Sequence, residues 1–173
     1  MPHYDAIVVG SGAAGGMAAY KLCQSGLRVL LLEAGPDKDP RRENFHHKMP
    51  FDWPLRGAMS PQERDRYRIN KSANVYNKHV MMEDAEEPYS TPPGKPYTWV
   101  RSRVVGGKTL HWGRVSLRFS DYDFTAASRD GHGVDWPIRY AEIEPYYGFV
   151  ERLIGVAGTR ERLPHLPDGD FQP

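Results

Sequence analysis

The sequence contains one cysteine, no long apolar run and almost no net charge, and each shortage excludes a class of protein. A single cysteine in 173 residues excludes an intramolecular disulfide framework and a cysteine-rich metal site. No run approaches the ~18 apolar residues that a membrane-spanning helix needs. The 23 basic and 22 acidic residues leave a net charge of +1, which gives no overall field to attract nucleic acid or an anionic membrane surface. We therefore expect neither a nucleic-acid partner nor a membrane span.

A secretory signal is also missing from the beginning of the sequence, because the first apolar run starts within a few residues of Met1. This predicts a cytoplasmic location and leaves a periplasmic one open. The length corresponds to roughly one domain. The 17 glycines and 15 prolines together exceed the average share of about 12%, which indicates long loops between the regular elements.

Two apolar runs near the amino terminus, residues 6–9 and 29–32, are short and rich in branched side chains. Such runs are typical of strands that are buried on both faces. Between them, small apolar residues recur at helical spacing and predict a helix that ends near Gly26. The side of this helix that we expect to face a sheet carries Ala14, Ala18, Ala19, Leu22 and Cys23, so we interpret Cys23 as a packed thiol and not as a nucleophile.

A glycine-rich turn joins the first run to the predicted helix. Gly10 turns the chain, Gly12 lets a diphosphate approach the backbone, and Gly15 lets the helix pack closely, while the helix amino terminus offers N–H groups and a positive dipole end. Glu33 follows about 20 residues later, where a carboxylate accepts ribose hydroxyls and repels a 2′-phosphate, which argues against NADP. The spacing predicts a dinucleotide-binding fold with these candidate contacts: Gly10, Ser11, Gly12, Ala13, Ala14, Gly15, Glu33 and Ala34.

Residues 37–96 show no sustained helical or strand periodicity, and we interpret them as a loop-rich insertion or lid. Arg41-Arg42 and the arginine cluster at 64–68 are interleaved with acidic residues, which favours a solvated surface over a nucleic-acid site. His46-His47 lacks a partner at metal-ligand spacing. We expect the acidic stretch 83–87 to be exposed.

A second glycine turn, Gly106-Gly107, again invites the close approach of a ligand to the backbone. Arg103 precedes it and can reach a cofactor with its planar guanidinium, although an ordinary surface arginine fits the pattern equally well. After the turn, apolar and polar residues alternate over residues 114–119 and predict a strand with one apolar face. We interpret Trp112 and Trp136 as packing aromatics and not as substrate platforms.

With both motifs in order, the chain resembles the glucose–methanol–choline oxidoreductases, which are FAD enzymes. The resemblance includes the amino-terminal fingerprint ending in Glu33-Ala34-Gly35 and the segment Arg103 to Trp112, which looks like the family's internal flavin-contacting signature. It extends to stretches at 123–124 and 136–147, which are similar to sugar and polyol dehydrogenases and pyranose oxidases. It implies an incomplete, three-layer α/β Rossmann-like FAD-binding domain with a parallel sheet, and adds these FAD contacts: Arg103, Gly106, Gly107, Thr109 and His111.

The resemblance also implies hydride transfer from a CH–OH group of a sugar, polyol or other alcohol to flavin N5, with a histidine as base. In the family that base lies far beyond this length, so we expect an amino-terminal piece of a larger enzyme, with no catalytic base and no metal site of its own. Its parts would be a βαβ unit (1–36), an insertion or lid (37–96) and a flavin-contacting segment leading into the next region (97–173). Alone, it would expose apolar sheet edge and bind FAD poorly.

Several alternatives stay open at this point. His111 stands where some family members attach the flavin covalently, and the resemblance is equally compatible with a histidine that only contacts the flavin. The electron acceptor could be a separate subunit, and the oligomeric state is undetermined. The chain could also be a non-catalytic nucleotide-binding or interaction module that needs a separate partner chain. An NAD-dependent dehydrogenase would use the first motif too, but it leaves residues 106–111 unexplained.

Overall fold

The computed structural model describes residues 3–38 and 49–172, and the chain divides into two compact units, 1–112 and 113–173. Each unit has its own elements and its own contacts. No helix among the described residues is both long enough and apolar enough to cross a membrane.

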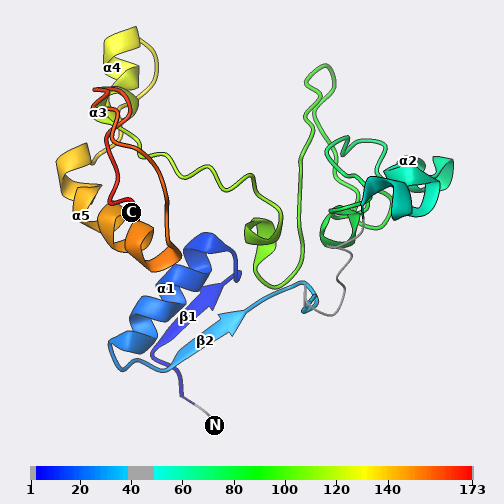
Figure 1. The fold of residues 1–173 in the computed structure, drawn as a ribbon. Helices are drawn as coiled ribbons and strands as arrows, with labels where there is room; N and C mark the ends of the chain where they lie inside the picture. Colours follow the sequence, from blue (N-terminus) through cyan, green and yellow to red (C-terminus); the bar gives the residue numbers. More distant parts are fainter. Residues whose placement is uncertain (1–2, 39–48, 173) are drawn as a thin grey trace. The chain divides into compact units, whose positions relative to one another are not determined.

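The first unit begins with a βαβ arrangement: strand β1 (Ala6–Val9), helix α1 (Ala13–Gln24) and strand β2 (Val29–Leu32). The two strands pair in parallel, with Ala6 opposite Val29, and α1 packs against both of them (Figure 1). Both strands and the helix were predicted from the sequence, and the α/β class with a parallel sheet is confirmed. The described residues contain this one two-stranded sheet.

Helix α1 ends as expected, but its covered side is narrower than the predicted one. Gly26 has a φ of +80°, in the left-handed region, directly after the helix cap at Ser25. The half-buried side includes Gly15 and Leu22, whereas three of the residues expected to face the sheet are exposed: Ala14, Ala18 and Cys23. Gly15 lies directly over the backbone of Gly10, in the middle of this covered side. The interpretation of Cys23 as a packed thiol is therefore wrong.

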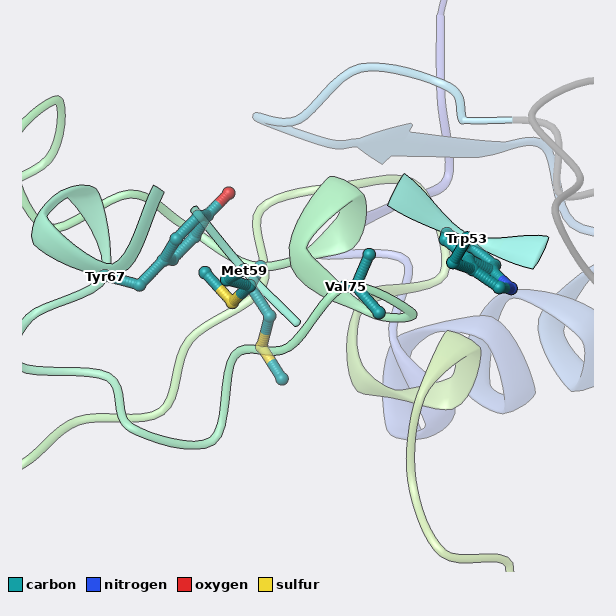
Figure 2. Packing of buried hydrophobic residues seen from close by; sticks show 5 residues of the cluster. Trp53, Met59, Tyr67 and Val75 are labelled. Atoms are coloured by element: carbon teal, nitrogen blue, oxygen red, sulfur yellow. The ribbon is translucent and has the colours of Figure 1, made fainter. Parts of the chain in front are cut away.

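Residues 49–102 contain short helices and a hydrophobic cluster of their own. The helices are η1 (Pro50–Asp52), η2 (Pro54–Gly57), α2 (Pro61–Arg66) and η3 (Lys78–Val80). The buried side chains of this segment form one cluster (Figure 2), which consists of Trp53, Met59, Tyr67, Val75 and Met81. Ala73 and Val100 are partly buried and pack against it. The loop-rich segment therefore has a small hydrophobic core of its own, which its lack of periodicity did not reveal.

The short helix α2 had a signal in the sequence that the periodicity argument missed. Ser60 accepts the backbone N–H of Glu63, and the Glu63 carboxylate accepts the backbone N–H of Ser60 at 2.8 Å. This reciprocal pair is a capping box, and Pro61 at the first helical position adds to it. The sequence Ser-Pro-Gln-Glu therefore specifies a helix start without any long apolar pattern.

The acidic stretch 83–87 is only partly exposed, which corrects the expectation. Asp84 is buried, and one of its carboxylate oxygens accepts the backbone N–H groups of Ile69 at 3.1 Å and Asn70 at 2.9 Å. A buried carboxylate needs such donors, because an unpaired charge is costly to remove from water. Asp84 thus holds the turn after α2 in place.

The second unit contains helices α3 (Asp121–Phe124), α4 (Ala126–Asp130) and α5 (Tyr140–Ile154). Its most buried ion pair joins Arg118 to Glu151 of α5, through bonds of 2.7 and 2.6 Å from the guanidinium to the two carboxylate oxygens. Such a bidentate pair is geometrically specific.

The strand predicted over residues 114–119 does not form. The alternation is real but inverted: Val115 and Leu117 are exposed, whereas Arg118 and Ser120 are buried. The pairing of Arg118 with Glu151 decides which side faces inward. A pattern of apolar and polar residues alone could not reveal a partner 33 residues away.

The two tryptophans that we expected to pack are largely exposed, Trp112 at 41% and Trp136 at 56%. Trp136 still meets the buried Phe124 edge to face, with ring centroids 6.4 Å apart. Neither tryptophan is therefore a core residue of this chain, and packing at an interface stays a prediction.

Candidate functional site

The first glycine turn, residues 10–15, is open on one side and closely packed on the other, and we call it the glycine cradle. Gly10 has a φ of +90°, and its N–H donates to the carbonyl oxygen of Leu32 at 2.7 Å, which fixes the turn to the end of β2. A side chain on Gly12 would point into open space, with nothing within 4 Å. A side chain on Gly15 would instead clash with the carbonyl group of Gly10. The glycines therefore keep one side of the turn open and the other closely packed.

The amino terminus of α1 opens into the same space. Gly12 is its N-cap, and among the described residues no side chain caps this end. The first N–H groups of a helix lack partners within the helix, and the helix dipole favours negative charge there. Open space, free N–H groups and the dipole suit a diphosphate, so the residues present fit the group that the fingerprint implies.

Glu33 follows β2 and is held by four hydrogen bonds. Oε2 accepts the backbone N–H of Ser11 at 2.9 Å and its hydroxyl at 2.5 Å, while Oε1 accepts the backbone N–H groups of Ala34 at 2.8 Å and Gly35 at 2.9 Å. The hydrogen bond from the Ser11 hydroxyl is the largest cause that lowers the pKa of Glu33 to about 2, followed by the backbone bonds of Ser11 and Gly35. Glu33 is thus a fixed negative charge beside the first turn.

The second glycine turn lies against the first. Gly106 has a φ of +88° and caps the short helix η4 (Gly107–Leu110), and its N–H donates to the hydroxyl of Ser11 at 2.8 Å. A side chain on Gly107 would stand 3.5 Å from the Cα of Gly12. Two motifs about 95 residues apart in sequence therefore meet in one place, within the first unit.

The end of β2 supplies the surface on which the second motif rests. The N–H of Val105 donates to the carbonyl oxygen of Pro36 at 3.0 Å. Any side chain on Gly35 would overlap the backbone of Arg103 and Val104. The sequence Glu33-Ala34-Gly35 thus has a second use, because its glycine permits the close contact between the two motifs.

The other candidates in the second motif have partners within the protein. The Arg103 guanidinium pairs with the Glu87 carboxylate, and the Thr109 hydroxyl donates to the carbonyl oxygen of Gly106 at 2.5 Å. Ala13, Ala14 and Ala34 are exposed beside the first turn. The structure therefore brings Gly106 and Gly107 to the first glycine turn, whereas the Arg103 side chain is engaged by an acidic residue of the 49–102 segment.

His111 is half-buried at the end of η4, and one of its ring nitrogens, Nε2, is hydrogen-bonded to the hydroxyl of Ser102. Burial lowers the pKa of His111, and the charge of Lys108 acts in the same direction, while a hydrogen bond to its own backbone opposes them. The neutral imidazole is therefore favoured. Ser102 orients this ring, and the sequence reasoning gave it no role because it precedes the glycine motif.

A cavity of about 460 Å³ adjoins this histidine through Ser102. Arg101 projects between two aromatic rings of this region, 4.9 Å from the centroid of Tyr89 and 5.1 Å from that of Trp99. The volume falls in the range of small-molecule sites. Its lining combines aromatic and cationic side chains with Ser102, and includes Met82, Glu87, Trp99, Arg101, Arg103 and Lys108.

Two features considered in the sequence, Arg41-Arg42 and His46-His47, lie outside the described residues. Within the ranges 3–38 and 49–172, no group of three or more His, Cys, Asp and Glu side chains is placed to hold a metal ion. The site is thus built from glycine turns, Glu33, Ser11 and His111 with Ser102.

The chain is similar to several known proteins. Residues 8–69 match the family model of the NAD(P)-binding Rossmann-like domain. The chain is similar to the fructose dehydrogenase large subunit of Gluconobacter japonicus, with 31% identity over 94% of this chain and 29% of that protein. It is similar to paromamine 6'-oxidase of Streptomyces fradiae, with 31% identity over 91% and 24% of the two chains. It is also similar to 2-methyl-1,2-propanediol dehydrogenase of Mycolicibacterium austroafricanum, with 30% identity over 89% and 25%.

The domain match and the parallel βαβ arrangement define a Rossmann-like nucleotide-binding domain. The relatives are oxidoreductases of the glucose–methanol–choline type, so the family resemblance drawn from the sequence is confirmed. The chain spans less than a third of the length of these relatives.

Proposed function

We propose that the chain is the amino-terminal FAD-binding portion of an oxidoreductase that oxidises a CH–OH group of a sugar, a polyol or another alcohol. The observation that carries the proposal is the meeting of the two glycine turns at Ser11, because a nicotinamide-binding motif alone leaves residues 106–111 unexplained. When bound, FAD supplies the acceptor for the hydride that leaves the alcohol carbon.

The residues of the chain would divide the binding between them. The open turn from Gly10 to Gly12 and the first N–H groups of α1 would hold the diphosphate, and Glu33 would take the ribose. The turn from Gly106 to Thr109, together with Arg103, would border the flavin end. We assign no catalytic base to this chain, and the organisation 1–36, 37–96 and 97–173 stays part of the proposal.

His111 would contact the flavin from the end of η4. Ser102 orients its ring, and the lowered pKa keeps the imidazole neutral, so that a ring nitrogen retains a lone pair. A neutral imidazole can act as a hydrogen-bonding partner and also as the nucleophile of a covalent linkage. The two roles differ in whether flavin stays with the protein after denaturation.

The test is the visible spectrum of the longest native reading frame that contains these residues, recorded before and after acid precipitation. Flavin absorption in the native protein is the expected result. Flavin in the pellet means a covalent link, which the His111→Ala variant would then abolish. A protein without visible absorption that binds a nicotinamide nucleotide would contradict the proposal.

Two matched variants assign the flavin to the glycine cradle. In Gly12→Val the Cβ atom meets no protein atom within 4 Å and the side chain occupies the open side of the turn, so we expect the variant to fold and to lose flavin. Gly16→Ala places a methyl group 3.7 Å from the carbonyl oxygen of Ser11, an ordinary contact, and serves as the control that keeps flavin. Equal flavin contents in the two variants would place the cofactor elsewhere.

The proposed oxidoreductase needs an electron donor and an electron acceptor as partners. The substrate would be a small-molecule alcohol or sugar, and the electron acceptor would be oxygen, a quinone or a separate subunit. The relative from Gluconobacter is itself named as a large subunit. Reduction of the bound flavin by a panel of sugars and polyols, followed spectroscopically without oxygen, would identify the donor.

A further inference from the structure

Ser11 carries the side chain that lies between Glu33 and the second glycine turn. Its hydroxyl donates to Oε2 of Glu33 at 2.5 Å and accepts the N–H of Gly106 at 2.8 Å. A serine hydroxyl has one proton to donate, and Glu33 receives it. The same oxygen atom of Ser11 therefore connects the acidic residue at the end of β2 with the Gly106 turn.

The carboxylate of Glu33 has no acceptor position left for a ribose hydroxyl. An ionised carboxylate offers about four lone-pair positions, and four protein donors occupy them. Three of these donors are backbone N–H groups, which can leave only if the turn or the end of β2 changes its path. The fourth is the hydroxyl of Ser11, which can leave by rotation about one single bond.

We propose that the Ser11 hydroxyl holds the place of a nucleotide ribose hydroxyl on Glu33, and that ribose binding displaces it and alters its contact with Gly106. The proposal rests on the proposed nucleotide-binding function and deepens it. One hydrogen bond to Oε2 replaces another, so the carboxylate stays fully satisfied. Because the Gly106 N–H donates to the same hydroxyl, this hydrogen bond of the second turn changes when a ribose hydroxyl binds to Glu33.

Removal of the Ser11 hydroxyl should have two measurable effects, one on ribose binding at Glu33 and one on the Gly106 amide. In Ser11→Ala the three backbone N–H groups still orient the Glu33 carboxylate, and one acceptor position becomes free. Ribose then binds without displacing a protein donor, and a net hydrogen bond corresponds to a factor of roughly 2 to 10 in affinity. Ser11→Thr keeps a hydroxyl at the same position and is the matched control.

The experiment uses ADP, which carries ribose and diphosphate without a flavin. Its dissociation constant is measured by calorimetry for the flavin-free form of the longest native reading frame that contains this chain, and for its Ser11→Ala and Ser11→Thr variants; hydrogen exchange of the Gly106 amide is measured without ligand. We expect Ser11→Ala to bind ADP roughly 2 to 10 times more tightly than the wild-type chain. We also expect its Gly106 amide to exchange faster, and Ser11→Thr to resemble the wild type in both.

The outcomes distinguish the two proposals. The proposal that the Ser11 hydroxyl occupies the place of a ribose hydroxyl (its placeholder role) would be overturned if Ser11→Ala bound ADP as tightly as the wild type or more weakly. Unchanged hydrogen exchange at the Gly106 amide would also overturn it. If none of the three proteins binds ADP, the nucleotide-binding function itself fails and the placeholder role falls with it. Faster exchange at Gly106 in Ser11→Ala would in that case show the hydroxyl contact to be purely structural.

Discussion

The βαβ arrangement at residues 3–38 has a clear hydrophobic pattern but no buried residue, whereas the segment 49–102 has no such pattern but contains a buried cluster. The βαβ residues carry the strongest motif in the chain, yet none of those described there is buried, and Val9 is 80% exposed. The segment without periodicity contains the cluster around Trp53 and Tyr67. The glycine motif thus specifies its backbone locally, whereas burial depends on which elements cover it.

The exposed apolar side chains of β1 and β2 have a simple physical cause. Ile7 and Val9 belong to a strand whose composition suits burial on both faces, and among the described residues β2 is its one partner strand. Exposed apolar sheet was expected from the sequence. It follows that side-chain substitutions in the two regions should have very different effects on the free energy of unfolding of this chain.

The largest expected effect compares Trp53→Ala with Ile7→Thr. Trp53 is 8% exposed and meets Tyr76 edge to face at 5.0 Å, so its truncation should destabilise the chain by about 3–5 kcal/mol. Ile7 is 63% exposed, so its substitution should change stability by less than about 0.5 kcal/mol. Urea denaturation followed by circular dichroism measures both. Equal losses would show that β1 is covered in solution.

A smaller effect separates two neighbouring glycines of α1. Gly15→Ala forces a methyl group against the carbonyl group of Gly10 and should cost about 1–3 kcal/mol, although alanine is the better helix former. Gly16→Ala meets no such obstacle and should be neutral or stabilising. The same denaturation curves decide this pair. A stabilising Gly15→Ala would mean that α1 does not rest on the first turn.

Glu33, after β2, and Glu63, in α2, both have a pKa of about 2, and they show how the two regions stabilise a carboxylate by different means. Hydrogen bonds from Ser11 chiefly lower the pKa of Glu33 to about 2, whereas the bond from Lys78 chiefly lowers that of Glu63 to about 2. Because both folded values lie below the ordinary 4.5, both groups stabilise the fold above that pH and lose this contribution as the pH falls toward 2.

Salt distinguishes the two carboxyl groups. In 1 M salt, screening of Lys78 should raise the pKa of Glu63, while the uncharged donors of Ser11 should leave that of Glu33 nearly unchanged. Carbon-13 NMR titration of the side-chain carboxyls measures both values, and Ser11→Ala should raise the pKa of Glu33 alone. A strong salt dependence at Glu33 would point to a cationic partner in place of the serine.

The smallest expected effect concerns Cys23, the residue whose environment the helical pattern misassigned. The thiol is exposed, so Cys23→Ser should change stability by less than about 0.5 kcal/mol. A thiol reagent should also label the native chain as fast as the unfolded one. Slow labelling of the native chain would restore the packed interpretation.

The parts of the fold that could be predicted are those that nearby residues specify. The strands around the Gly10 turn and the helix stop at Gly26 follow from short motifs, whereas the role of the Gly106 turn was expected only from the family resemblance. The pairings of Arg118 with Glu151, Arg103 with Glu87 and Ser102 with His111 could not be predicted, because each depends on a contact between residues separated in sequence.

The most direct test of the account follows the backbone amides of both glycine turns by NMR during titration with FAD, in the nitrogen-15-labelled longest native reading frame that contains this chain. If Gly12 and Gly106 belong to one nucleotide site, their signals should shift together and give the same dissociation constant. A shift at Gly12 alone, or two different dissociation constants, would contradict the claim that the two turns form one site.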